Sequence, residues 1–237
     1  MNPTIAMITM RGLLGRRRFL LLFPLPLLLV GAAALARSTG VPPTEWAGHV
    51  LVGLGIAVVL PLIALVVGTG VLGSEIDDGT LTHVLAKPLP RWQIVLTKLA
   101  VAVAVVTTVT ATAGFLAGLL AGSGRLAVGM AVGCLVGAMA YSALFLALSV
   151  VSRRPVLLGL LYVLIWEGLL GNLLAGTRSL SIQQYVVTVV GKVAGTDLLG
   201  GTVSLRVSLI MAAIFAVAAT ALAIDRLRSF TVAGETG

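Results

Sequence analysis

Acidic side chains are scarce in this 237-residue chain, and two of their locations could carry chemistry. Three of the eight Asp and Glu residues, Glu75, Asp77 and Asp78, lie within four positions between two apolar runs. They indicate either a surface that binds another protein or a solvated loop whose carboxylates cap a helix start. Glu167, beside Trp166, lies inside an apolar run. If that run crosses a membrane, the carboxyl group contacts a substrate or cation, accepts hydrogen bonds from a neighbouring helix, or lies near the outer interface.

Other reactive groups are few and isolated. Cys134 is the only cysteine and lies in an apolar run, which excludes an intrachain disulfide and a thiolate metal cluster. His49 and His83 are far apart, and no His, Asp or Glu pair has the spacing of metal ligands on a helix. The sequence has no G-x-x-x-x-G-K-[ST] phosphate-binding loop. We therefore expect no catalytic residue, metal or cofactor in this chain.

The elements that carry these residues are apolar and long. Apolar residues make up 59% of the chain and charged residues 10%, with a mean hydropathy of +1.13. A helix needs about 20 apolar residues to cross the hydrocarbon core of a bilayer. Six stretches of about that length occur, at 19–36, 49–72, 94–122, 126–151, 156–176 and 204–224. The sequence therefore predicts an all-α integral membrane protein with about six transmembrane helices in one domain, 1–237, with a kink at Pro24 and Pro26.

The distribution of basic residues predicts the orientation. With both termini in the cytoplasm, 11 of the 16 Lys and Arg residues fall on the cytoplasmic side, as basic residues in short loops do. Topology and anionic lipid headgroups then account for the net charge of +8, and no nucleic acid is expected as a partner. Arg16 to Arg18 before an apolar run also fit a cleaved twin-arginine signal, but five more apolar stretches follow.

Glycines recur every four residues on two neighbouring spans. The rows are Gly114, Gly118 and Gly122, and Gly129, Gly133 and Gly137. Small residues at this spacing let helix backbones approach closely in membranes. We expect the third and fourth spans to pack against each other or against another subunit through these rows.

The segment 73–93, between the second and third spans, is the most informative part of the chain. Its acidic residues lead into Gly79-Thr80-Leu81, and Pro88 and Pro90 precede the next span. Leu81, Val84 and Leu85 would form the apolar side of a short helix along the membrane surface. In order and spacing, the loop resembles that of the ABC-2 type permeases, the membrane subunits of ATP-binding-cassette exporters. The residues that carry the resemblance are Glu75, Gly79, Thr80, Leu81, Pro88, Arg91 and Lys98.

The resemblance implies an ABC-2 exporter architecture and a mechanism. The loop would be a coupling helix seated on a separate ATPase subunit, which binds ATP and Mg²⁺. The coupling residues would be Glu75, Asp77, Asp78, Gly79, Thr80, Leu81, Pro88 and Arg91. A second permease copy or a paralogue and membrane lipids would be the other partners, in a bacterial cell membrane. Residues 1–18 would form an amphipathic helix, 177–203 an external loop, and Glu167 and Trp166 part of the substrate path. Pro90 departs from the family pattern, in which Ser is commoner.

Three other classes of membrane protein share some of these features. A secondary transporter or channel would explain Glu167 without an ATPase, but it leaves the acidic loop unexplained. A haem-exporter-type permease is a close relative in mechanism. The CDP-alcohol transferases share Asp77-Asp78-Gly79 but need a following Ala-Arg and two further aspartates, which are absent. The transported substrate does not follow from the sequence.

Overall fold

The computed structural model describes residues 7, 9–10, 22–77, 90–170, 180–196 and 203–232, with side chains described for all of these except 73–77, 170 and 228–232. Every regular element in these ranges is a helix, which confirms an all-α membrane protein. Three long single helices are α6 (Arg91–Leu120), α7 (Gly124–Val151) and α11 (Leu205–Val232), and two shorter ones are α2 (Pro24–Ser38) and α10 (Ile182–Ala194). The second and fifth predicted spans are composite. The second consists of α3 (Pro43–Ala47), the π-helical segment η2 (Gly48–Val59) and α4 (Leu60–Asp77), and the fifth of α8 (Pro155–Leu161) and the π-helical segment η3 (Tyr162–Leu170).

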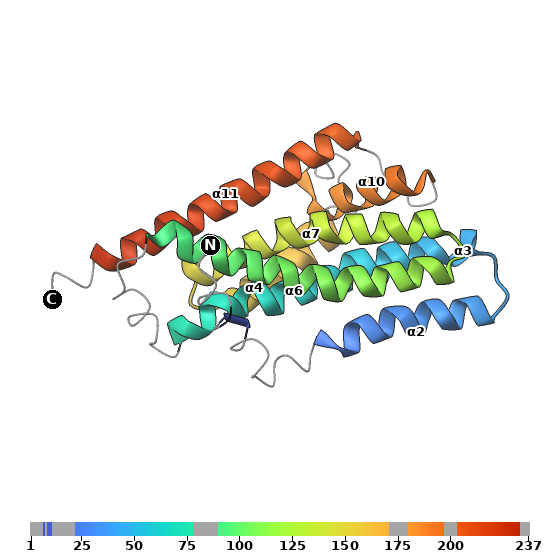
Figure 1. Cartoon of the computed structure of the whole chain (residues 1–237), viewed down its shortest axis with the longest axis horizontal. Helices are drawn as coiled ribbons and strands as arrows, with labels where there is room; N and C mark the ends of the chain where they lie inside the picture. Colours follow the sequence, from blue (N-terminus) through green and yellow to red (C-terminus); the bar gives the residue numbers. More distant parts are fainter. Residues whose placement is uncertain are drawn as a thin grey trace.

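Four helices in the described part of the chain are long and apolar enough to cross a membrane. They are Pro43–Leu72, Arg91–Leu120, Gly124–Val151 and Leu205–Leu227. Two further apolar helices, Pro24–Ser38 and Pro155–Leu169, are shorter. The long helices lie side by side along the bundle, and α6 and α7 run in opposite directions (Figure 1).

Prolines mark where helices begin. Pro24 and Pro155 occupy the first positions of α2 and α8, where a missing N–H leaves no helical hydrogen bond unmade. Pro26 also lies in the first turn of α2, so the predicted kink is wrong: the two prolines start the helix. Pro90 is extended and directly precedes α6.

Helix α7 is the centre of the bundle. It packs against α4, α6, α10 and α11, and its buried side chains include Met130, Tyr141 and Phe145. Its first turn is capped by Ser123, whose Oγ accepts a hydrogen bond of 3.2 Å from the Leu126 N–H. In Figure 1, α10 is a short helix beside the end of α7 that lies near α3, away from the C-terminal end of α11.

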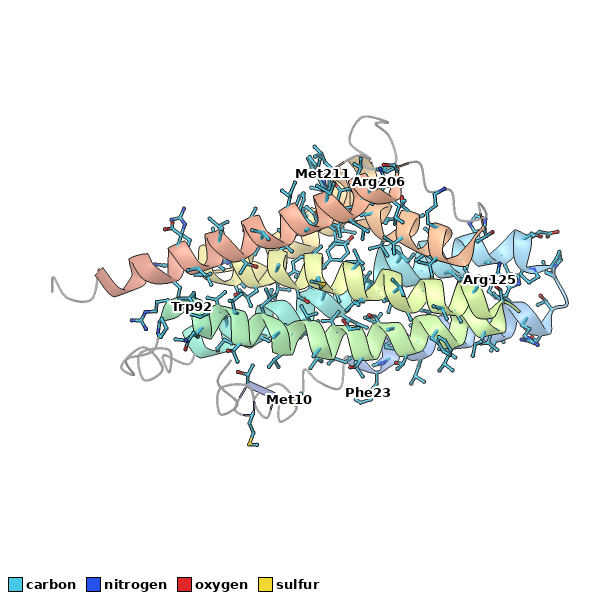
Figure 2. All side chains as sticks on the ribbon, turned by 45° about the horizontal axis from the view of Figure 1, so that its top comes forward. Met10, Phe23, Trp92, Arg125, Arg206 and Met211 are labelled. Carbon is cyan, nitrogen blue, oxygen red and sulfur yellow. The ribbon has the colours of Figure 1, made fainter. Side chains whose placement is uncertain are left out.

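The two ends of the bundle carry different interfacial residues. Trp92, at the start of α6, and Arg125, at the start of α7, lie at opposite ends (Figure 2). Both side chains are exposed. Indole rings and basic side chains favour the boundary between hydrocarbon and water, so these two positions fit the two surfaces of a membrane.

Candidate functional site

The Glu167 carboxylate, on η3, receives hydrogen bonds from three separate helices. Its Oε1 accepts from the hydroxyl of Tyr141 on α7 at 3.2 Å and from that of Tyr162, on η3 itself, at 3.1 Å. The same oxygen accepts from the backbone N–H of Ile182, the first residue of α10, at 3.0 Å. Glu167 is 3% exposed, so these bonds replace the water that a surface carboxylate would have.

The second oxygen of Glu167 completes the start of α10. Oε2 accepts a short hydrogen bond from the Ser181 hydroxyl and a bond of 3.4 Å from the Gln183 N–H. Ser181 is the N-cap of α10, and its Oγ accepts from the Gln184 N–H at 3.3 Å. The first three N–H groups of α10 therefore all have acceptors. A carboxylate at this end is also favoured by the helix dipole.

Below this cap, α10 lies on the row of glycines of α7. A Cβ added at Gly129 would lie 2.8 Å from the Val190 carbonyl oxygen, and one at Gly133 would overlap Cγ2 of the same valine. At Gly137 it would meet Val186 at 2.9 Å and also a side chain of α4. The α7 row therefore faces α10, which the sequence did not indicate.

The α6 row divides between two roles. Gly114 lies against Met130 of α7, and a Cβ at Gly118 would lie 2.6 Å from the Ala127 Cα, so these two glycines bring α6 close to α7. Gly122 lies beyond α6, in the turn to α7, with φ +82° and no atom within 4 Å of an added Cβ. Glycine at this position therefore allows the positive φ of the turn and makes no helix contact.

A cavity of about 460 Å³ lies between the two π-helical segments and the first turn of α10. Its wall is mainly apolar, with one imidazole and one amide. The lining residues are Gly48, His49, Val52, Gly53, Ala57, Val58, Leu62, Leu160, Val163, Leu164, Gly168 and Gln183. A cavity of this size and character fits a small organic molecule or part of a larger one.

The two residues expected in the substrate path lie beside this cavity and are not part of its lining. Glu167 precedes Gly168, which does line it. Trp166 donates from Nε1 to the Leu180 carbonyl oxygen at 3.4 Å, which ties η3 to the residue just before the N-cap of α10. The cavity wall therefore includes neighbours of Glu167 and Trp166 in sequence and space.

The expected coupling residues lie mostly outside the described part of the chain. Glu75 and Asp77 lie in the last turns of α4, where only the backbone is described, and Arg91 is the first residue of α6. Asp78, Gly79, Thr80, Leu81 and Pro88 lie outside the described residues, as does most of the expected amphipathic segment 1–18.

Lys98 links the two helices on either side of the acidic loop. It lies two turns into α6, its side chain is 1% exposed, and its Nζ donates to the Val71 carbonyl oxygen of α4 at 3.0 Å. A buried ammonium group needs acceptors in place of water. The contact therefore fixes the end of α4 relative to the start of α6.

Sequence reasoning missed the hydroxyl groups around Glu167. Tyr162 and Glu167 are five residues apart, which on an α-helix places them about 140° apart around the axis. In η3 the backbone makes i to i+5 hydrogen bonds, so residues five apart lie on one face. Ser181 carried a recognisable signal as an N-cap residue before an apolar stretch. Tyr141 carried no such signal, because the sequence does not indicate which group a tyrosine in a long apolar helix contacts.

Ionisable groups elsewhere in the described residues do not form a metal site: no three His, Cys, Asp or Glu side chains there come together. Cys134 is buried and lies against Gly114.

Tyr185, on α10, is buried. Burial raises the pKa of its phenol, and the Glu167 carboxylate raises this pKa further. The phenol is therefore neutral at physiological pH.

Comparison with known proteins identifies the family. The family described as ABC-2 family transporter protein matches residues 16–167, more than half of the chain. That range includes the acidic loop and ends at Glu167. No curated protein sequence matches the chain. Members of this family are the membrane components of ATP-binding-cassette transporters. These components take part in transport and are not themselves catalytic. With its apolar helices and this match, the chain belongs to the ABC-2 family as a multi-pass membrane permease.

Proposed function

We propose that the chain is the permease subunit of an exporter in a bacterial cell membrane, with six spans and both termini in the cytoplasm. A separate ATPase subunit binds ATP and Mg²⁺ and contacts the loop over 73–93. A second copy of the chain, or a paralogue, completes the transport path, and membrane lipids surround the pair. Closure of two ATPase subunits then rocks the two permeases and opens the path alternately to each side.

The family match is the observation that carries this proposal. It is supported by the position of the acidic motif. Glu75 lies near the end of α4, and Pro88 precedes the start of α6 at Arg91, so the motif joins two helices that are long enough to cross a membrane. Lys98 adds a direct link between these helices through Val71. A force applied to the loop would therefore reach both helices.

The cavity between η2 and η3 is the proposed contact site for the substrate. Its apolar wall, with His49 and Gln183 as polar groups, fits a molecule with an apolar body and at least one hydrogen-bonding group. The two segments that form it are π-helical, a geometry that is frequent at functional sites because it displaces side chains from the regular helical pattern.

The proposal predicts the effect of changes in the acidic loop. Glu75→Ala removes a candidate charge-assisted hydrogen bond to the ATPase, and Gly79→Val removes the backbone freedom that a glycine gives this position. Both variants should insert normally but retain the ATPase about tenfold more weakly or worse, as expected for the loss of a hydrogen bond to a charged group. The measurements are a pull-down of the ATPase subunit and ATP hydrolysis by reconstituted complexes.

Glu45→Ala is the matched control for this experiment. Glu45 is an exposed acid on α3, at the opposite end of the bundle from the start of α6, so its loss should leave ATPase retention unchanged. Wild-type retention in both loop variants would show that the loop is only a connector. If no ATPase co-purifies with the unaltered chain, the secondary transporter or channel becomes the better hypothesis.

A further inference from the structure

Glu167 has no free capacity to bind a substrate. An ionised carboxylate offers about four lone-pair positions, and this one already receives five donors: three hydroxyls and two backbone N–H groups. It is almost fully buried and does not line the neighbouring cavity. A cation or polar ligand would have to displace protein donors to reach it. The geometry therefore favours a hydrogen-bonding role over direct substrate contact.

The five donors connect Glu167 to one element more than to any other. Three of them come from Ser181, Ile182 and Gln183, which form the N-cap and first turn of α10. The other two come from tyrosines of α7 and η3. Without the carboxylate, most of the donors that lose their acceptor would therefore lie at the start of α10.

The first turn of α10 also provides part of the cavity wall. Gln183 donates its backbone N–H to Glu167 and lines the cavity. Gly168, the residue after Glu167, lines it from η3. One carboxylate therefore joins two parts of the wall that come from different elements.

From these contacts we propose that Glu167 is a positioning residue: its carboxylate holds the first turn of α10 and so places Gln183 in the wall of the cavity between η2 and η3. The inference rests on the proposed function only in treating that cavity as the substrate site. The contact itself exists whether or not an ATPase drives transport, and thiol labelling can measure it without transport.

The single cysteine makes a direct test possible. With Cys134 replaced by Ala, Gln183→Cys places one thiol in the cavity wall and keeps the backbone N–H that Glu167 accepts. A second reporter, Val52→Cys, lies on η2 across the cavity. Alkylation rates of each thiol by a small maleimide are measured in purified protein in nanodiscs, for Glu167 and for Glu167→Gln, Glu167→Leu and Glu167→Asp.

The amide and the shorter acid separate shape from hydrogen bonding. Glutamine keeps the volume of Glu167 but has one acceptor oxygen, and in either orientation its NH₂ group would face a backbone N–H, that of Ile182 or that of Gln183, which cannot accept a hydrogen bond. We expect alkylation of the thiol at position 183 to rise about tenfold or more in Glu167→Gln and in Glu167→Leu, because the start of α10 opens locally. The thiol at position 52 should change less than about twofold, and Glu167→Asp, which keeps both oxygens, should restore part of the protection.

The outcomes decide between the alternatives. Equal alkylation of the thiol at position 183 in all four proteins would overturn the proposal. A parallel rise at position 52 would also contradict it, since that result means general loosening and not displacement of α10. If the Glu167 variants do not accumulate in the membrane, two other variants test the contact: Ser181→Ala removes one donor to Oε2 together with the cap on Gln184, and Tyr141→Phe removes one donor to Oε1 without altering α10. Unchanged labelling rates at position 183 in both variants would then reject the proposal.

Discussion

Tyr141 and Ser142 are neighbours on α7, and both are fully buried, but only one of their hydroxyl groups has a partner in the described part of the chain. Tyr141 donates to Glu167, and its ring stacks on Phe145 with centroids 5.9 Å apart. The Ser142 Oγ is buried without a hydrogen-bond partner there. A buried hydroxyl stabilises a protein when it is paired and destabilises it when it is not. Removal of the hydroxyl oxygen should therefore lower the free energy of unfolding at Tyr141 but not at Ser142.

We predict that Tyr141→Phe lowers the free energy of unfolding and that Ser142→Ala does not. Tyr141→Phe keeps the stacked ring but removes one donor to a carboxylate, at a cost of about 0.5–2 kcal/mol, the range for hydrogen bonds between membrane helices and to charged groups. Ser142→Ala should be neutral or slightly stabilising. Thermal denaturation of both variants in detergent checks this; equal losses would show that the Tyr141 contact with Glu167 contributes nothing.

At the residue scale the sequence identified Glu167 but not its role. A carboxyl group in a long apolar run predicts a buried site with partners, and the structure contains one. The identity of the partners depends on α10 folding back onto α7 and on the π-helical turn that brings Tyr162 beside Glu167. Neither is visible in residue spacing, which assumes a regular α-helix. A glutamine is also a poor replacement for Glu167, because each carboxylate oxygen accepts from a backbone N–H, which cannot accept a hydrogen bond from an amide NH₂ group.

At the scale of helices, the contact between α7 and α10 depends on the absence of side chains. At Gly129 an added Cβ would lie 2.8 Å from a backbone oxygen, which cannot rotate away as a side chain can. We predict that Gly129→Ala lowers the free energy of unfolding by about 1–3 kcal/mol, the usual cost of overpacking. Thermal denaturation in detergent measures the loss.

Gly31→Ala is the control of opposite sign. Gly31 lies inside α2 with no atom within 4 Å of an added Cβ, so alanine meets open space. Alanine in a helix interior is favoured over glycine by about 1 kcal/mol, so Gly31→Ala should be neutral or stabilising. A loss in Gly31→Ala as large as that in Gly129→Ala would mean that glycine replacement itself, and not the α10 contact, is responsible.

Helix positions followed from the sequence more readily than helix contacts did. Runs of apolar residues, with Pro90 just before α6 and Pro155 as the first residue of α8, mark where the helices lie, because length and hydropathy suffice for this. The glycine rows predicted close packing, but Gly133 packs against α10 and not against α6. A row of small residues shows that a helix has a flat face; which neighbour covers that face depends on the whole bundle.

At the scale of the whole molecule, charge and helix order together predict which end faces the cytoplasm. Arg125 lies at the start of α7, and Arg153 lies just after its last residue, so one helix long enough to cross a membrane separates them. Both side chains are exposed. The distribution of basic residues predicts that Arg153 lies inside and Arg125 outside. These two positions can report the orientation of the chain without any fusion partner.

We predict that a membrane-impermeant maleimide labels Arg125→Cys in intact cells and labels Arg153→Cys only after the membrane is permeabilised. Each variant is made with Cys134 replaced by Ala, so the introduced thiol is the only one in the chain. Substitution of a single exposed arginine leaves most of the basic residues on each side, so it should not invert the topology. Denatured protein provides the control for complete labelling of both thiols. The reverse pattern would place both termini outside, and it would move the acidic loop away from any cytoplasmic ATPase.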